Sequence, residues 1–145
     1  MILEFDKYAH EGNHFINEVA HQLGSDRGKA ARLTQVVLHA LRDTLPVNEA
    51  IHIAQGLPMA LKGVFVDQYE VARVPKVHRS KQEFLMFIWN KLSNPNEFND
   101  TDEIAEGFRA VYIVLSQHLA SGQIERLNNS LHSEILDILR TSERE

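Results

Sequence analysis

Apolar residues recur along this chain at the three- and four-residue spacing of amphipathic helices. One such stripe runs from His14 to Leu23, and Gly24 marks its end. The same spacing continues to about Leu45, where Pro46 interrupts it. This periodicity indicates helices throughout the chain, and we expect no strand.

The apolar pattern of the first half of the chain returns in the second half. Four positions near the start of each half correspond, namely Phe15, Ile16, Val19 and Leu23 with Phe84, Leu85, Ile88 and Leu92. What repeats is apolar position rather than chemistry, so the repetition predicts an architecture. We expect one all-α domain over residues 1–145, in which eight helices form two tandem four-helix repeats packed into a compact bundle. Repeat one spans about residues 10–66, the linker about 67–79 and repeat two about 80–141.

Polar residues suited to capping mark several helix starts. Ser80 and Glu83 have the spacing of a capping box before an apolar run, and Asp26 and Asp100 precede two other helices. The last helix should begin near Leu131 and fray over residues 141–145. The helices that follow Asp26 and Asp100 are apolar on most sides, so we expect them at the centre of the bundle.

The bulk composition limits the functions that the chain can serve. It has no Cys and a formal net charge of −5, which excludes disulfides, thiolate metal sites and Cys nucleophiles. The acidic balance opposes nucleic-acid binding through phosphate neutralisation. No apolar run approaches the ~20 residues of a membrane span, and the N-terminus lacks the apolar core of a signal peptide. We therefore expect a soluble cytoplasmic protein with no cofactor, no membrane association and no nucleic-acid partner.

The segment His10-Glu11-Gly12-Asn13-His14 matches the H-E-x-x-H pattern of zinc hydrolases. On a helix, this spacing places two imidazoles on one face for the metal, with the glutamate as general base. His21 lies near the same line of a helix. The motif raises the alternative of a zinc-dependent hydrolase, with His10, His14 and His21 as candidate metal ligands.

Helical geometry argues against a hydrolytic site at this motif. A helix that contains His14 directs its imidazole away from the stripe of Phe15 and Val19 and toward water, whereas zinc hydrolysis needs a walled cleft. Residues 12 and 13 also suit a helix start, with Asn13 as the cap and His10 outside the helix. We expect at most weak surface metal binding at these histidines.

The first helix of repeat two has an additional apolar flank. It contains Met86, Phe87 and Trp89, and the helix of repeat one has Asn17 and Glu18 at the positions of the first two. An exposed patch of this kind is unusual for a monomer, so it needs a cover. We expect cover from within the chain ahead of cover by a second subunit. The segments available are the N-terminal one (Ile2, Leu3, Phe5 and Tyr8) and the linker (Val66, Tyr69, Val71 and Val74).

The linker concentrates positive charge in an acidic protein. Arg73, Lys76, Arg79 and Lys81 fall within nine residues that contain no acidic side chain. A solvated connector explains such a stretch, and pooled charge also steers small anions or acidic partners toward a surface.

These features favour a non-catalytic interaction or scaffold module that binds a protein partner or forms a homodimer. Its contact surface would be the helix flank of Met86, Phe87 and Trp89 or the basic linker residues Arg73, Lys76 and Arg79. The zinc hydrolase described above is one alternative. Another is a small-ligand pocket enclosed between the two repeats and lined by Tyr112 and His39.

Four segments of the chain carry a family resemblance. They are Phe5–Ala9, Gly12–Gly24, Val37–Asp43 and Leu57–Asp67. Through them the chain resembles, over about residues 5–140, the bacterial family called domain of unknown function 2267. The resemblance implies an all-helical, duplicated fold, and it implies no activity and no metal motif at His10. Residues 45–47 depart from the family's pattern, which leaves the start of the third helix open.

Overall fold

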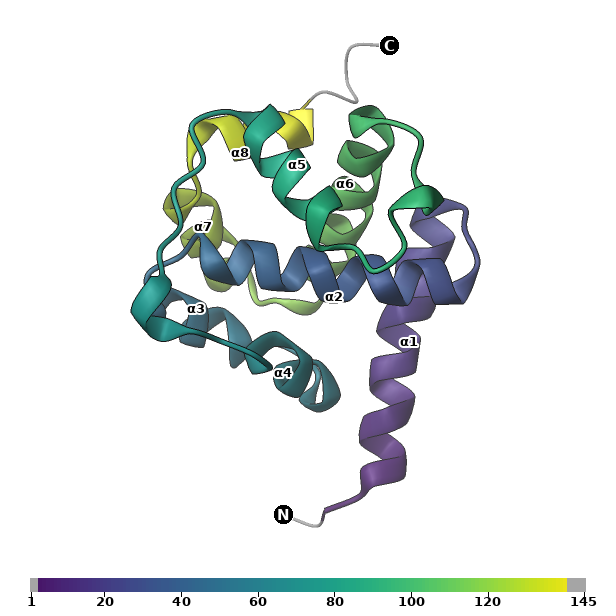
Figure 1. Cartoon of the computed structure of the whole chain (residues 1–145). Helices are drawn as coiled ribbons and strands as arrows, with labels where there is room; N and C mark the ends of the chain where they lie inside the picture. Colours follow the sequence, from purple (N-terminus) through teal and green to yellow (C-terminus); the bar gives the residue numbers. More distant parts are fainter. Residues whose placement is uncertain (1–2, 141–145) are drawn as a thin grey trace.

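The computed structural model describes residues 3–140, and this part of the chain contains eight α-helices, two short 3₁₀ helices and no strand (Figure 1). The all-α prediction is therefore confirmed. The α-helices are α1 (Phe5–Leu23), α2 (Arg27–Asp43), α3 (Val47–Ala54), α4 (Met59–Val66), α5 (Lys81–Lys91), α6 (Thr101–His118), α7 (Ser121–Ser130) and α8 (Ser133–Arg140). The 3₁₀ helices are η1 (Val71–Arg73) and η2 (Pro95–Glu97).

Short polar side chains cap three of the helices, as the sequence predicts. The carboxylate of Asp26 accepts a 2.8 Å hydrogen bond from the first turn of α2. Ser80 Oγ accepts a 3.1 Å bond from the amide of Glu83 in α5. Asp100 does the same for α6 at 2.9 Å. Each cap satisfies an amide that has no partner within its helix, so these starts are fixed locally.

The start of α1 differs from the prediction. The helix begins at Phe5 and continues without a break to Leu23, so His10 lies on the helix and the prediction that Asn13 caps it is wrong. Gly12 is buried where α1 crosses α4, and a Cβ atom at this position would lie 3.1 Å from Cβ of Ala60. The glycine therefore serves close helix packing and does not end the helix.

The last helix also differs slightly, because α8 begins at Ser133 and not near Leu131. The predicted fraying of residues 141–145 lies outside the described residues.

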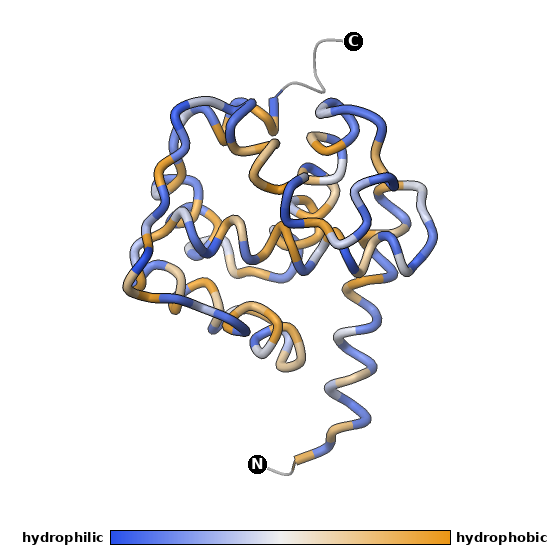
Figure 2. The backbone as a smooth tube through the Cα atoms, in the orientation of Figure 1, coloured by the Kyte–Doolittle hydropathy of each residue, from blue (hydrophilic) through white to orange (hydrophobic). Residues whose placement is uncertain are grey.

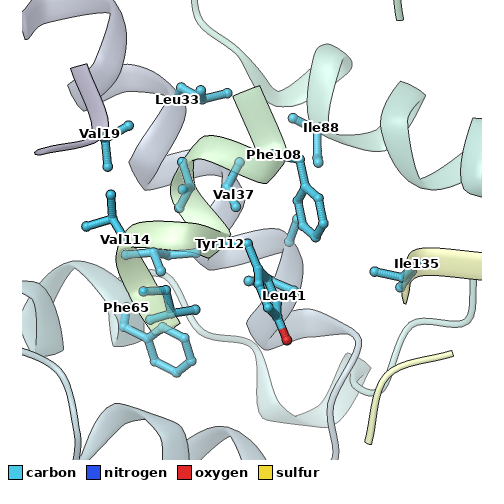
Figure 3. Packing of buried hydrophobic residues seen from close by; sticks show 14 of the residues in the cluster. Val19, Leu33, Val37, Leu41, Phe65, Ile88, Phe108, Tyr112, Val114 and Ile135 are labelled. Carbon is cyan, nitrogen blue, oxygen red and sulfur yellow. The ribbon is translucent and has the colours of Figure 1, made fainter. Parts of the chain in front are cut away.

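The central helices of the core are α2 and α6. Nine residues of α6 and eight of α2 are buried, more than in any other described helix. Figure 3 shows side chains of both helices meeting those of α1, α4, α5 and α8. The labelled residues are Leu33, Val37 and Leu41 of α2, Phe108, Tyr112 and Val114 of α6, and Val19, Phe65, Ile88 and Ile135. Full burial of a side chain of this size contributes about 2 kcal/mol, so this cluster dominates the stability.

The other helices are arranged around this pair (Figure 1). α1 packs against α2, α4 and α6, while α5 packs against α2, α6 and α8, and α3 contacts α4 and α7. Figure 2 shows apolar positions alternating with polar ones along the helices. The N-terminal turns of α1 extend beyond the body, and Phe5 there is 73% exposed. The tandem repeat stays a prediction from the apolar pattern.

None of the helices between residues 3 and 140 combines the length and the apolar character that crossing a bilayer requires.

Candidate functional site

A groove of about 580 Å³ lies between α2, the linker and α5. The linker runs from the end of α4 past the end of α2 to the start of α5 (Figure 1). Charged side chains of all three segments line the groove. The cations are Arg32, Arg42, Arg73, Lys76 and Lys91, and the carboxylates are Asp43 and Glu70. Positive charge therefore predominates here, although the whole chain has a net charge of −5.

Three of these cations have carboxylate partners. The buried guanidinium of Arg42 lies 2.9 Å from Oδ1 of Asp43. Arg32 donates a 2.8 Å hydrogen bond to Glu97 of η2. Glu97 raises the pKa of Arg32, and Arg32 lowers the pKa of Glu97. These two arginines are thus committed to the protein itself.

Arg73 has a weaker partner. Its Nε lies 3.8 Å from Glu70 and both side chains are largely exposed, so this pair contributes little to stability.

Lys76 and Lys91 differ from the other cations of the groove. Within residues 3–140, neither ammonium group has a carboxylate at ion-pair distance. Both lie near the ring of Phe87, at 5.8 Å and 5.5 Å from its centroid. A cation–π contact at this distance is weak and leaves the positive charge uncompensated. The Phe87 ring therefore lies near two unpaired positive charges, one from the linker and one from α5.

Two contacts hold the linker in place as one wall of the groove. The amide of Lys76 donates a 2.6 Å hydrogen bond to the carbonyl oxygen of Asp43 at the end of α2. The ring of His78 packs on α5, 5.3 Å from the ring of Phe84 and 4.9 Å from that of Phe87. The linker thus bridges from α2 to α5 and fixes where Lys76 lies.

His78 is an unusual residue for a surface segment because it is only 8% exposed. Its Nε2 is buried and has no hydrogen-bond partner among the described residues. Burial lowers the pKa of His78, and Lys76 acts in the same direction while Glu83 opposes them. The imidazole is therefore held neutral at pH 7 and acts as an apolar cover for α5.

His39 and Tyr69 contribute neutral polar groups to the groove. His39 Nε2 lies 2.6 Å from the carbonyl oxygen of Val64, which can only accept, so the neutral imidazole carries its proton on Nε2. Burial lowers the pKa of His39, and the bond to Val64 opposes this effect. The Tyr69 ring stacks on Arg42, and its hydroxyl is buried without a partner in the described part of the chain.

The helix flank and the basic linker, predicted as separate surfaces, partly meet in this groove. Phe87, Arg73 and Lys76 line it together. Met86 is 37% exposed and lies outside the lining, as does the exposed Arg79. Trp89 is partly buried and donates a 3.0 Å bond from Nε1 to the carbonyl oxygen of Pro95. Of the three flank residues, only Phe87 therefore lines the groove.

The linker supplies the cover for Phe87, whereas the described N-terminal residues lie at the far end of the molecule (Figure 1). The covering residue is His78. Val66 and Val71, expected to share in the cover, are 42% and 55% exposed. Ile2 lies outside the described residues.

The H-E-x-x-H segment lines a second, more open hollow of about 450 Å³, together with Leu57 and His118. The His14 side chain is 63% exposed, which agrees with its predicted direction toward water. Glu18 lies between two imidazoles, 3.7 Å from His14 and 2.8 Å from His118 of α6. This carboxylate therefore ties α1 to α6.

The three candidate metal ligands are not gathered into one site. His10 and His14 border the hollow, whereas His21 lies outside its lining on an exposed part of α1. Over residues 3–140, no group of three His, Asp or Glu side chains is placed to hold a metal ion. The geometry thus gives the hydrolase alternative no support.

Tyr112 and His39 do not share a pocket. Tyr112 is buried in α6, its hydroxyl bonds to Asn128, and burial raises its pKa to about 12. His39 of α2 lines the groove, and Tyr112 is not part of that lining. A pocket does lie between segments of the two halves of the chain, but its aromatic residues are Tyr69 and Phe87.

The sequence reasoning missed Lys91, which completes the positive pair. One signal could have found it, because Phe87 and Lys91 are four residues apart and therefore lie on one face of α5. Arg32 and Arg42 carried no comparable signal, since each sits within an apolar helix.

Comparison of the sequence with curated proteins finds no match. A family model does match the chain over residues 12–138, and its description is "Uncharacterized conserved protein (DUF2267)". This range includes the groove, the linker and every helix except the first turns of α1 and the end of α8. The resemblance expected from the sequence is confirmed, and the chain belongs to the DUF2267 family.

Proposed function

We propose that this protein is a non-catalytic interaction module that holds a partner protein in the groove between α2, the linker and α5. One observation carries the proposal: Phe87, Arg73 and Lys76, from two separate segments, line a common groove in which cations outnumber carboxylates. Such a surface combines an aromatic anchor with charge that steers an oppositely charged partner. The hydrogen bonds of Arg32 to Glu97, of His39 to Val64 and of Arg42 to Asp43 are structural contacts and require no catalytic role.

In-cell photo-crosslinking tests this proposal. A photoreactive amino acid replaces Gln35, an exposed residue that lines the groove, and in a matched control it replaces the exposed Gln117 of α6, outside the groove. We expect a discrete crosslinked product from position 35 that disappears when Lys76→Glu and Lys91→Glu are added. Products from position 117 should not change. The mass of the product distinguishes another protein from a second copy of this chain.

The proposal fails if position 35 gives no product, or if its products survive the charge reversal. Circular dichroism of the charge-reversed protein checks that the helices are intact.

A second candidate function is the binding of a small molecule in the same groove. Its volume of about 580 Å³ falls within the range of roughly 300–1,000 Å³ that small-molecule pockets occupy. Native mass spectrometry of the purified protein tests this alternative, because it reports bound ligand, metal and subunit count together.

A further inference from the structure

The charges in the groove are unequal in what they can offer a ligand. Arg42 and Arg32 are engaged with Asp43 and Glu97, and Arg42 also donates to backbone carbonyls. Within residues 3–140, the ammonium groups of Lys76 and Lys91 have neither a carboxylate nor a carbonyl partner, and both lie near the ring of Phe87. An anionic group bound beside this ring would compensate both charges.

The position of this pair is built into the fold. Lys76 is placed by its backbone bond to Asp43 and by the neighbouring His78, which is packed on α5. Lys91 lies at the end of α5, one turn beyond Phe87. The two ammonium groups thus reach the same ring from the linker and from the end of α5, whereas charges scattered on a surface helix would have no such common target.

From this convergence we infer that the groove binds an acidic segment of a partner protein, with a side-chain carboxylate held between Lys76 and Lys91 beside Phe87. The inference rests on the proposed function, which it makes chemically specific. Charge-assisted hydrogen bonds from two ammonium groups to one carboxylate are among the stronger polar contacts that a protein surface offers. Arg73 at the rim provides a third cation for a neighbouring acidic residue of the same segment.

The rest of the groove favours such a segment over a continuous polyanion. Asp43 and Glu70 also line it, and they would repel a closely spaced run of phosphates. Val36 and Phe87 supply apolar contacts that a peptide side chain can use and an inorganic anion cannot. An acidic peptide with apolar residues therefore matches both the charge and the surface.

Fluorescence anisotropy with the purified full chain tests the inference. The probe is a labelled peptide of about eight residues that alternates Glu with Leu, and the matched control peptide has Gln at every Glu. We expect the acidic peptide to bind, its affinity to fall with added salt, and the Gln peptide to bind at least about tenfold more weakly.

Two protein variants separate the local site from total charge. Lys76→Gln with Lys91→Gln should weaken binding of the acidic peptide at least about tenfold. Lys7→Gln with Lys62→Gln removes the same charge outside the groove and should change the affinity less than about threefold. Lys91→Gln alone gives an intermediate loss and guards against a folding defect in the double variant.

Several results would overturn the inference. These are no binding of the acidic peptide at about 1 mM, equal losses in the two double variants, or binding of polyuridylate, phosphate or anionic vesicles that matches that of the peptide. If crosslinking from position 35 still depends on the groove in that case, a partner binds there by other chemistry, and the proposed function survives. If crosslinking shows no groove dependence, the proposed function itself fails.

Discussion

The guanidinium of Arg42 donates a 2.8 Å hydrogen bond to the carbonyl oxygen of Phe65, and so joins α2 to the last turn of α4. The same nitrogen lies 2.7 Å from the carbonyl oxygen of Asp67, where the linker begins. Carbonyls at the end of a helix have no partner within it, so this buried cation satisfies them. One side chain therefore closes α4 and sets the direction in which the linker leaves.

Replacing Arg42 should destabilise the protein strongly. In Arg42→Met the aliphatic volume stays, but two carbonyls and the Asp43 carboxylate lose their buried partner. We expect a loss of about 3 kcal/mol in the free energy of unfolding, measured by urea denaturation. Arg126→Met, which breaks an exposed ion pair with Glu49, is the control and should cost much less. An equal loss of unfolding free energy in the two variants would show that burial does not increase the stabilisation from the Arg42 contacts.

The contact between α2 and α6 at Gly107 predicts the effect of a single methyl group. A Cβ atom at Gly107 would lie 2.7 Å from Cδ2 of Leu33, so the fully buried Leu33 side chain would have to shift within the packed core. We expect Gly107→Ala to lower the free energy of unfolding by about 1–3 kcal/mol through overpacking of the α2–α6 contact. Gly63→Ala is the control, because nothing lies within 4 Å of its added methyl. That variant should gain roughly 0.5–1 kcal/mol from helix propensity, as thermal or urea unfolding can show.

The buried imidazole of His78 predicts a stability that depends on pH. Because burial lowers its pKa in the folded state, the unfolded chain binds the proton more readily. The stabilising contribution is therefore complete above the unfolded pKa of about 6.5 and declines as the pH falls below it. His39, whose pKa burial also lowers, acts in the same direction.

Urea denaturation at pH 7.5 and pH 5.0 measures this effect. His78→Phe keeps an aromatic ring against Phe84 and Phe87 but removes the titration, so the variant should lose less stability between the two pH values than the unaltered protein. Gly63→Ala, which removes no titratable group, is the control and should leave the pH dependence unchanged. An unaltered pH dependence in His78→Phe would contradict the prediction.

The buried hydroxyl of Tyr69 predicts a neutral or stabilising substitution. This oxygen has no hydrogen-bond partner within residues 3–140, so its removal costs no bond. Tyr69→Phe keeps the ring on Arg42 and should leave the free energy of unfolding unchanged or raise it by up to about 1 kcal/mol. Tyr112→Phe is the comparison, since it removes a bond to Asn128 and should be destabilising. A marked loss in Tyr69→Phe would reveal a partner for the hydroxyl.

The helices could be predicted from the sequence because their signals are local. Asp26, Ser80 and Asp100 cap the helices that they precede, and the apolar stripes mark the faces that are buried. The prediction that the helix starts after Gly12 was wrong, because Gly12 allows close packing against Ala60, which is distant in sequence. Local propensity could not reveal that contact.

The groove was only half predictable for the same reason. The sequence marked Phe87 and the basic linker as separate candidate surfaces. What unites them is the bond between Lys76 and Asp43 and the packing of His78 on α5, and both are tertiary contacts. The charge of Lys91 has meaning only after the linker has brought Lys76 beside the same ring.

The linker, which forms one wall of the groove, also connects α2 to α5. Lys76 is tied to the end of α2 and His78 to the face of α5, two anchor points separated by a single residue. A partner that binds Lys76 would therefore pull on the linker and strain the contact between α2 and α5. Binding in the groove would then change the rate of amide hydrogen exchange at both contacts, including backbone that the partner does not touch.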